Sequence, residues 1–102
     1  MEDEKWVNVR EGIMRKPLAE NRKWGLQADI MRIKPNFKDK AHRHDDYEWV
    51  YILEGSFTDA KGKHSKGEFL ENNTEDIHQV TTGAEGCTLL IVWCGSVKPT
   101  AD

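Results

Sequence analysis

A chain of 102 residues with 37% hydrophobic residues and a formal net charge of −3 is expected to form one domain around a single core. This composition argues against a disordered chain, and the lack of a basic excess argues against a nucleic-acid partner. No apolar run is long enough to span a membrane and the start MEDEKW is not a signal peptide, so we expect a cytoplasmic protein whose Cys87 and Cys94 stay reduced.

The first part of the chain is expected to be extended. Residues 6–12 (WVNVREG) are typical of a short opening strand, whereas residues 10–22 give no clear pattern, although Pro17 excludes a long helix there. Residues 24–33 (WGLQADIMRI) alternate in polarity, which predicts a second strand. One face of this strand carries Gln27 and Asp29, and the other carries Trp24, Leu26, Ala28 and Ile30.

The rest of the chain is expected to alternate between strands and turns. In order these are a strand at 48–55 (EWVYILEG), a hairpin turn near 59–62 (DAKG), a turn at 65–68 (SKGE), a strand at 77–80 (IHQV), a loop at 81–86 (TTGAEG), a strand at 87–93 (CTLLIVW) and a frayed tail. Seven or eight short strands in all predict an all-β sandwich or barrel, formed by one domain over residues 1–102.

Two histidines and a glutamate precede the most strand-like segment. On a strand His42 and His44 point the same way, with Cα atoms about 7 Å apart, so both imidazoles can bind one cation. Glu48 has the same parity as Val50 and Ile52, which predicts that it faces an apolar interior. A bound metal ion would supply the charge that offsets the cost of a carboxylate there.

A third histidine extends this candidate site. His78 shares a strand face with Val80, and three imidazoles with one carboxylate suit a divalent ion of iron, manganese, nickel, copper or zinc. The alternative is that residues 42–48 are a solvated loop of mixed charge. His64, in the segment GKHSKG, is interpreted as an ordinary satisfied histidine rather than a ligand.

These residues resemble the two motifs of the cupin family. The first motif is H-x-H, a glutamate after three or four residues, and a glycine after six more, and it is matched by His42, His44, Glu48 and Gly55. The second motif, a glycine and an acidic residue with a histidine eleven positions after the glycine, is matched by Gly67, Glu68 and His78. Over residues 24–94 the chain is most similar to the cupin domain of the ChrR anti-sigma factors and its single-domain relatives.

The resemblance implies a double-stranded β-helix, or jelly-roll cupin barrel, with one divalent metal ion bound by His42, His44, Glu48 and His78. Three positions depart from the motif, because Asn73 and Glu75 replace its P-x-G turn and Thr82 replaces its last asparagine. The separate zinc domain that binds sigma factors has no counterpart here, so anti-sigma activity is not expected. Aromatic candidates for the barrel mouth are Trp24, Phe37, Phe57, Phe69 and Trp93, although each is by default a core residue and only some can line a pocket.

Three functions are compatible with such a site. The first is a metal-dependent oxygenase acting on a small chelating, dicarbonyl-like substrate, and the second is a non-catalytic module that binds or senses a small molecule through its metal. The third is a sugar isomerase or epimerase, which is weaker because no further acid-base cluster marks the strands. The apolar outward face formed by Trp49, Tyr51 and Leu53 predicts a homodimer, unless an N-terminal strand covers it.

Overall fold

A computed structural model describes residues 5–40, 42–44, 47–72, 77–94 and 97–99, with the side chains of 42–44, 77–78 and 97–99 outside the description. Every regular element in the described part is a β-strand, which confirms the all-β prediction. Those residues include no helix long and apolar enough to cross a membrane.

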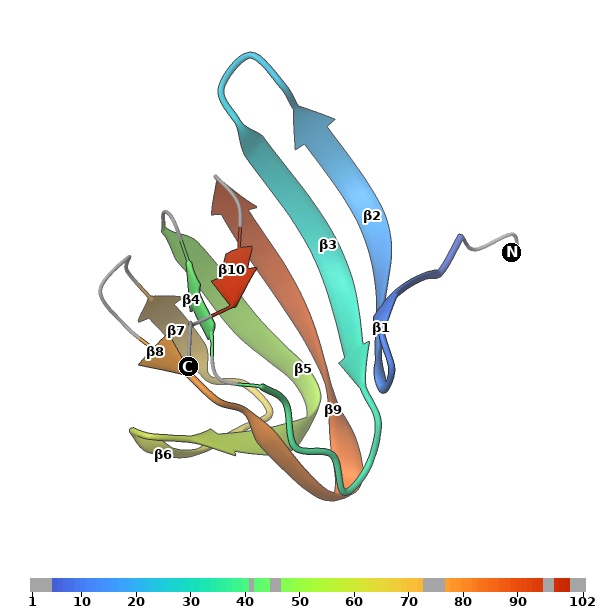
Figure 1. The fold of residues 1–102 in the computed structure, drawn as a ribbon, viewed down its shortest axis with the longest axis vertical. Coiled ribbons are helices and arrows are strands. Elements are labelled where there is room, and N and C mark those ends of the chain that lie inside the picture. The colour runs from blue at the N-terminus through green and yellow to red at the C-terminus, as the bar shows by residue number, and fades with distance from the viewer. Residues whose placement is uncertain (1–4, 41, 45–46, 73–76, 95–96, 100–102) are drawn as a thin grey trace.

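Within these described residues, ten strands form two antiparallel sheets (Figure 1). Their bounds are β1 Val7–Arg10, β2 Ile13–Asn21, β3 Leu26–Ile33, β4 His42–His44, β5 Glu48–Asp59, β6 Gly62–Ser65, β7 Phe69–Asn72, β8 Ile77–His78, β9 Thr81–Cys94 and β10 Val97–Pro99. The large sheet has the order β1-β2-β3-β9-β5-β6, with β7 also paired to β5, and the small sheet has the order β10-β4-β8. Figure 1 shows the large sheet strongly curved, with β9 and β5 in its middle.

The core lies on the inner face of the large sheet. Along the start of β5, Glu48, Val50 and Ile52 are buried while the residues between them are exposed, as the parity of the sequence predicts. The buried apolar residues are Ile13, Ile33, Val50, Ile52, Phe57, Cys87, Leu89 and Ile91. Each large side chain in this set contributes about 1.5–3 kcal/mol by leaving water.

Two segments, one predicted to be a loop and one without a clear pattern in the sequence, are strands. Residues 13–21 form β2, and the register shift between Pro17 and Ala19 allows a proline, which has no N–H to donate, within the sheet. The expected loop at 81–86 is wrong, because β9 runs without a break from Thr81 to Cys94. Its register with β5 shifts in this glycine-containing stretch, so the strand bends instead of ending.

Part of the C-terminal tail, expected to be frayed, is a strand. Residues 97–99 form β10, which pairs antiparallel with β4. Both expected turns are confirmed: Asp59 pairs with Gly62 at the end of the β5–β6 hairpin, and the Glu68 amide donates to the Ser65 carbonyl at 3.0 Å.

The alternation of β3 is confirmed, but the face that points inward is the polar one. Asp29 is fully buried and Ile33 is 4% exposed, whereas Leu26, on the opposite face, is 44% exposed. The register pairs Asp29 with Ile91, whose side chain belongs to the core. The inner surface of the sheet is therefore apolar on β5 and β9 and polar on part of β3.

Gly55, the last residue of the first motif, lies where two strands approach closely. Its φ of +75° is in the left-handed region, and a Cβ there would overlap the carbonyl of Gly86 on β9. Gly86 also has a positive φ, +69°, and a Cβ on it would lie 2.7 Å from the carbonyl of Ile33. Glycine is thus required at Gly55, where β5 lies against β9, and at Gly86, where β9 lies against the end of β3.

Candidate metal centre and ligand pocket

Glu48 is the first residue of β5 and is 5% exposed. In the sheet register it lies between Asn72 on β7 and Trp93 on β9. Its Oε1 accepts a hydrogen bond of 2.9 Å from the Asn72 side-chain amide, which is itself 6% exposed. The fold therefore places an oriented carboxylate at one end of the apolar inner face, as predicted.

The backbone brings the histidine positions together on the small sheet. His42 on β4 is the register partner of His78 on β8, and His44 is the partner of Val97 on β10. Directly opposed residues stand on the same face of a sheet, and so do residues two apart on one strand. His42, His44 and His78 therefore occupy one face of the small sheet.

The four-residue metal site itself stays a prediction. The side chains of His42, His44 and His78 lie outside the described ones, as do Asn73 and Glu75 of the altered turn. Among the side chains that the structure describes, no group of three or more His, Cys, Asp or Glu is arranged to hold a metal ion. The donor set of three histidines and one buried carboxylate nevertheless fits a divalent transition metal by its chemistry.

Asp29 is the centre of a polar network on the inner face. Its Oδ1 accepts from Arg15 Nη1 at 3.0 Å and its Oδ2 accepts from the indole of Trp93 at 2.8 Å. The Gln27 side-chain amide lies 3.1 and 3.3 Å from the two oxygens. Buried carboxylates persist when they are paired and hydrogen-bonded in this way.

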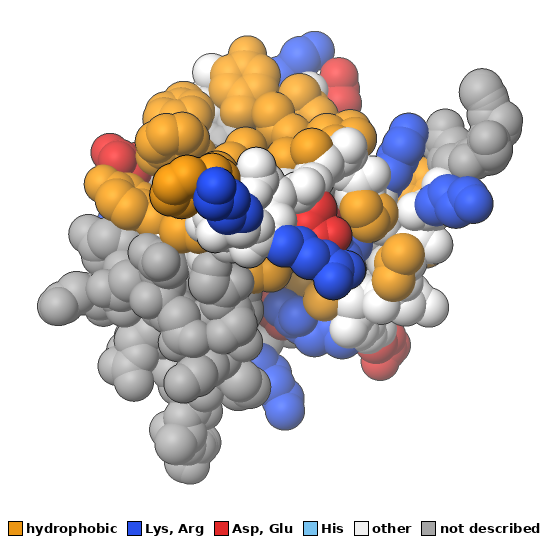
Figure 2. All heavy atoms as spheres, turned by 90° about the horizontal axis from the view of Figure 1, so that it is seen from above, with side chains coloured by type: hydrophobic (Ala, Val, Ile, Leu, Met, Phe, Trp, Pro, Cys, Tyr) orange, Lys and Arg blue, Asp and Glu red, His pale blue; other side chains and the backbone are white. Residues whose placement is uncertain are grey.

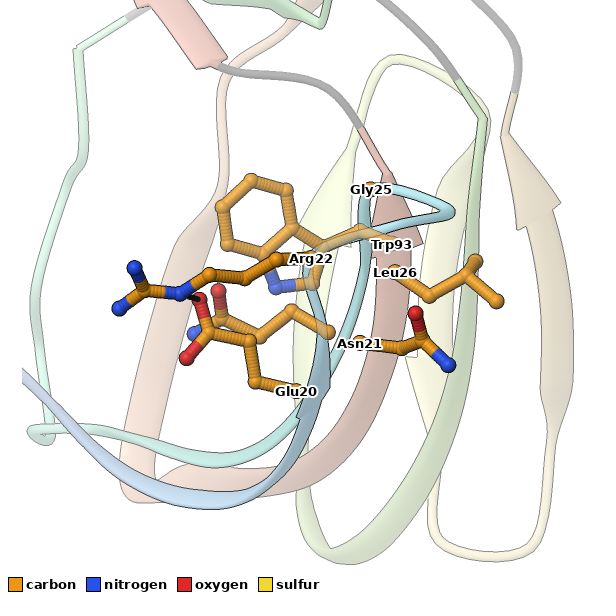
Figure 3. A pocket seen from close by; sticks show the side chains of 7 residues that line it. Glu20, Asn21, Arg22, Gly25, Leu26 and Trp93 are labelled. Atoms are coloured by element: carbon orange, nitrogen blue, oxygen red, sulfur yellow. Dashed lines mark ion pairs between the residues drawn. The ribbon is translucent and has the colours of Figure 1, made fainter.

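A pocket of about 290 Å³ opens beside this network, at the tip of the β2–β3 hairpin. Its lining residues are Glu20, Asn21, Arg22, Gly25, Leu26, Gln27 and Trp93. In Figure 3 Arg22 and Glu20 extend to the same side and form an ion pair of 3.3 Å, whereas Leu26 and Asn21 point the other way. Because Trp93 is the register partner of Glu48, this pocket adjoins the candidate metal centre.

Both ring nitrogens of His64 have hydrogen-bond partners, as the sequence predicts for a histidine that is not a metal ligand. Its Nε2 lies 3.0 Å from Asp59 Oδ1 and its Nδ1 lies 3.3 Å from Glu68 Oε1, and its ring packs on Phe57 with a centroid distance of 5.2 Å. The backbone amide of Ser65 donates to Glu68 Oε2 at 2.9 Å. That hydrogen bond, followed by the one to His64, lowers the pKa of Glu68. The acidic residue of the second motif therefore holds a turn.

Comparison with known proteins identifies the family. The sequence family described as the ChrR cupin-like domain matches residues 1–97. This chain belongs to the ChrR cupin-like family. No curated protein matches this cupin at the sequence level.

Solved structures confirm the cupin fold. An RmlC-like cupin protein from Ralstonia eutropha has a TM-score of 0.86 at 14% identity, over 98% of this chain and 69% of that one. Acetylacetone dioxygenase from Acinetobacter johnsonii has a TM-score of 0.86 at 12% identity, over 100% and 76%. The anti-sigma factor ChrR of Rhodobacter sphaeroides, solved with SigE, has a TM-score of 0.79 at 20% identity, and this cupin covers 50% of it with 90% of its own length.

Two aromatic residues expected at the mouth of this cupin barrel lie elsewhere. Trp24 is 68% exposed in the β2–β3 turn, and Phe69 is 60% exposed on the outer face of β7. Trp93 lines the pocket as predicted, while Phe57 belongs to the core and Phe37 packs against it. No local signal in the sequence distinguishes these positions, because exposure depends on which face of each strand turns inward.

Sequence reasoning also missed the polar inner residues of this cupin. Arg15 lies in the segment without a clear pattern, and Asn72 is the last residue of the short strand β7, whose inward face the sequence does not indicate. The alternation predicts the face of the strand on which Asp29 lies, but it does not indicate that this face points inward. One signal could have indicated this. The face of β3 opposite Asp29 is apolar, and so is the outward face of β5.

Proposed function

We propose that this cupin is a small mononuclear metal-dependent enzyme of the oxygenase type, acting on a small chelating, dicarbonyl-like substrate. The observation that carries the proposal is Glu48, a buried carboxylate held by Asn72 at the end of an apolar inner face. The pairing of His42 with His78 on the neighbouring small sheet supports it. His42, His44, Glu48 and His78 would hold the ion.

The chain's own residues provide the surroundings that such chemistry needs. A divalent ion, when bound, would polarise the oxygen atoms of a chelating ligand as a Lewis acid. Asn72 orients the Glu48 carboxylate, and Val50, Ile52 and Ile91 form an apolar floor that excludes water from the inner face. The pocket beside Trp93 is of a size for a small molecule.

Single histidine substitutions test the metal site. His42→Ala and His44→Ala should each lose most of the bound metal, because the remaining ligands cannot satisfy the ion alone. Elemental analysis of protein purified without added metal measures this and also identifies the ion, with His64→Ala as the control that keeps full occupancy. Full occupancy in both the His42 and His44 variants would contradict the assignment.

A binding or sensing module is the second candidate, and the family match favours it. The family is described by the cupin-like domain of ChrR, and the ChrR structure is that of an anti-sigma factor bound to SigE. Oxygen consumption separates the two functions: iron-loaded protein that consumes oxygen with acetylacetone is an enzyme. Tight metal binding and ligand binding without oxygen consumption would replace the enzyme by the binding module.

We also propose that two copies of this chain associate through the outer face of the large sheet. Trp49, Tyr51 and Phe69 are 48%, 42% and 60% exposed, and the rings of Trp49 and Phe69 lie 6.4 Å apart. Figure 2 shows hydrophobic side chains gathered over one side of the molecule. The described N-terminal strand, β1, pairs with β2 and leaves these residues exposed. Exposed apolar patches of this kind mark association surfaces.

A further inference from the structure

Arg15 presents a cationic group to the barrel interior. It shares the parity of the core residue Ile13 on β2, and its Nη1 donates to the fully buried Asp29 at 3.0 Å. The register pairs Arg15 with Met31, two residues further along β3 than Asp29. The side chain must therefore lean along the inner face, toward the end of the sheet that carries Glu48.

The guanidinium keeps hydrogen-bond donors to spare. It has five N–H groups, and in the described part of the structure Nη1 is its one nitrogen with a hydrogen-bond partner. Its side chain is 30% exposed, so the remaining donors can be reached by a ligand. The Asp29 carboxylate also accepts hydrogen bonds from Trp93 and Gln27, which hold it in place. The Arg15 guanidinium is therefore bound to a rigid acceptor. A fork held in this way matches a carboxylate.

Trp93 connects this group to the candidate metal centre. It lies between Glu48 on β5 and Gln27 on β3 in the sheet register, and its indole donates to Asp29. Two strand spacings separate β5 from β3, so the backbones of Glu48 and Gln27 are about 10 Å apart. A small dicarbonyl acid is of a length to span such a gap. A buried ion pair adds little net stability over apolar side chains, so stability alone does not account for the pair of Asp29 and Arg15.

We propose that Arg15, positioned by Asp29, binds an anionic group at the end of the ligand remote from the metal. The substrate class is then a small dicarbonyl acid, with chelating oxygens at one end and a carboxylate at the other, rather than a neutral diketone. This inference rests on the proposed function, because the metal holds the chelating end. Asp29 is a positioning residue, since it acts through Arg15.

The test compares two probes that differ in one group. Acetopyruvate carries a carboxylate in place of one terminal methyl group of acetylacetone, and both can chelate a metal. Calorimetric titration into metal-loaded and metal-free protein should show that wild type prefers acetopyruvate by about 10- to 100-fold, as charge-assisted hydrogen bonds predict. Arg15→Gln should remove the preference and leave acetylacetone binding unchanged within about twofold.

Arg32→Gln is the matched control, because Arg32 lies on the outer face of β3 and stacks on Trp6 at 4.2 Å. It should keep the preference of wild type. Asp29→Asn, which keeps the shape but removes the charge that orients Arg15, should reduce the preference to an intermediate value. Its acetylacetone affinity should stay that of wild type, which a general loss of structure would not allow.

The outcomes separate this inference from the proposed function. Metal-loaded wild type that binds both probes equally, or an Arg15→Gln variant that keeps the preference, overturns the inference and leaves the metal site standing. If wild type binds no metal but its preference still depends on Arg15, the anion-binding role of Arg15 stands, while the chelating end of the ligand and the proposed metal chemistry fail. No binding of either probe to any form overturns both.

A second variant covers the case in which Arg15→Gln does not fold. Arg15→Lys keeps a positive charge beside Asp29 but loses the planar fork, so it should fold and reduce the preference at least about threefold. Far-ultraviolet circular dichroism establishes that each variant is folded before titration. An Arg15→Lys variant with the full preference of wild type would overturn the role of the fork.

Discussion

Substitution of Glu48 tests whether this residue is a metal ligand or only a buried carboxylate. Glu48→Gln keeps an oxygen that can accept from Asn72, so the protein should stay folded, but it removes the negative charge. Loss of a residue that only hydrogen-bonds to a metal ligand weakens metal affinity about 10- to 100-fold. Loss of the charge of a ligand itself should therefore weaken metal affinity by at least about 100-fold. Metal titration measures the effect, with Glu71→Gln, on the exposed outer face of β7, as the control.

The pH dependence of metal binding gives a second readout at Glu48. Protons compete with the metal for ligands, so the affinity of wild type falls as the pH falls. With one titrating ligand fewer, the Glu48→Gln variant should show a shallower dependence between mildly acidic and neutral pH. Superimposable curves for the two proteins would leave a site of three histidines and remove Glu48 from it.

Asp29 makes a prediction about stability that does not depend on any ligand. Asp29→Ala leaves the Arg15 guanidinium and the Trp93 indole N–H without their acceptor, which should cost about 3 kcal/mol of the free energy of unfolding. Urea unfolding measures this loss. The control is Glu11→Ala, which breaks an exposed ion pair of 3.5 Å with Lys34 and should cost less than about 1 kcal/mol. An equal loss of unfolding free energy in both variants would show that the Asp29 network stabilises the protein no more than an exposed ion pair does.

At the scale of elements, the close pairing of β5 with β9 depends on Gly55. Gly55→Ala places a methyl group against the Gly86 carbonyl in a backbone with φ of +75°, so we expect a loss of more than about 3 kcal/mol or failure to fold. Gly62→Ala is the matched comparison, because Gly62 has a φ of +124° and no atom within 4 Å of its would-be Cβ. It should show backbone strain alone, about 1–3 kcal/mol. Urea unfolding of both variants distinguishes the two contributions.

The turn between β6 and β7 should weaken in acid. The Ser65 amide and His64 hold the pKa of Glu68 below its ordinary value of 4.5. A carboxyl with a lowered pKa in the folded state contributes stability above the unfolded pKa, and that contribution disappears as the pH falls through the folded value. The difference in melting temperature between wild type and Glu68→Gln should therefore shrink as the pH is lowered past 4.5. A difference that stays constant with pH would contradict this.

At the scale of the whole molecule, the outer-face patch predicts a homodimer. Light scattering at micromolar concentration should give twice the mass of one chain, and Tyr51→Lys should shift it toward the monomer because it places a charge in the centre of the apolar patch. Trp24→Lys is the control, since Trp24 is also exposed but lies in the β2–β3 turn. A monomeric mass for wild type would remove the proposed interface.

Much of this fold could be predicted because its strongest signals are local. The alternation from Glu48 to Ile52, the turns at 59–62 and 65–68 and the motif glycine at 55 all follow from short-range sterics and parity. The assignment of β2 and of the first half of β9 could not be made, because Pro17 and the stretch 81–86 are tolerated only through register shifts against neighbouring strands. Such shifts are properties of the assembled sheet.

The candidate site divides in the same way. The motif spacing predicts which residues could bind a metal, and this ligand set stays a prediction, although His42 and His78 are register partners in the small sheet. The inward direction of Asp29 could not be predicted, because a carboxylate is stable there only with donors from β2 and β9. Those donors, Arg15 and Trp93, are 14 and 64 positions away in the sequence.

The position of Trp93 gives the protein a natural spectroscopic reporter. Trp24 and Trp49 are 68% and 48% exposed, so their fluorescence should be red-shifted and easily quenched by iodide. Trp93 packs against the core and donates its indole proton to Asp29, which should place its emission at shorter wavelength and protect it from the same quencher. Trp6, half-buried beneath Arg32, is the fourth indole, so in a Trp6→Phe variant light on the blue edge of the spectrum should come from Trp93. Occupation of the pocket can then be followed without a label.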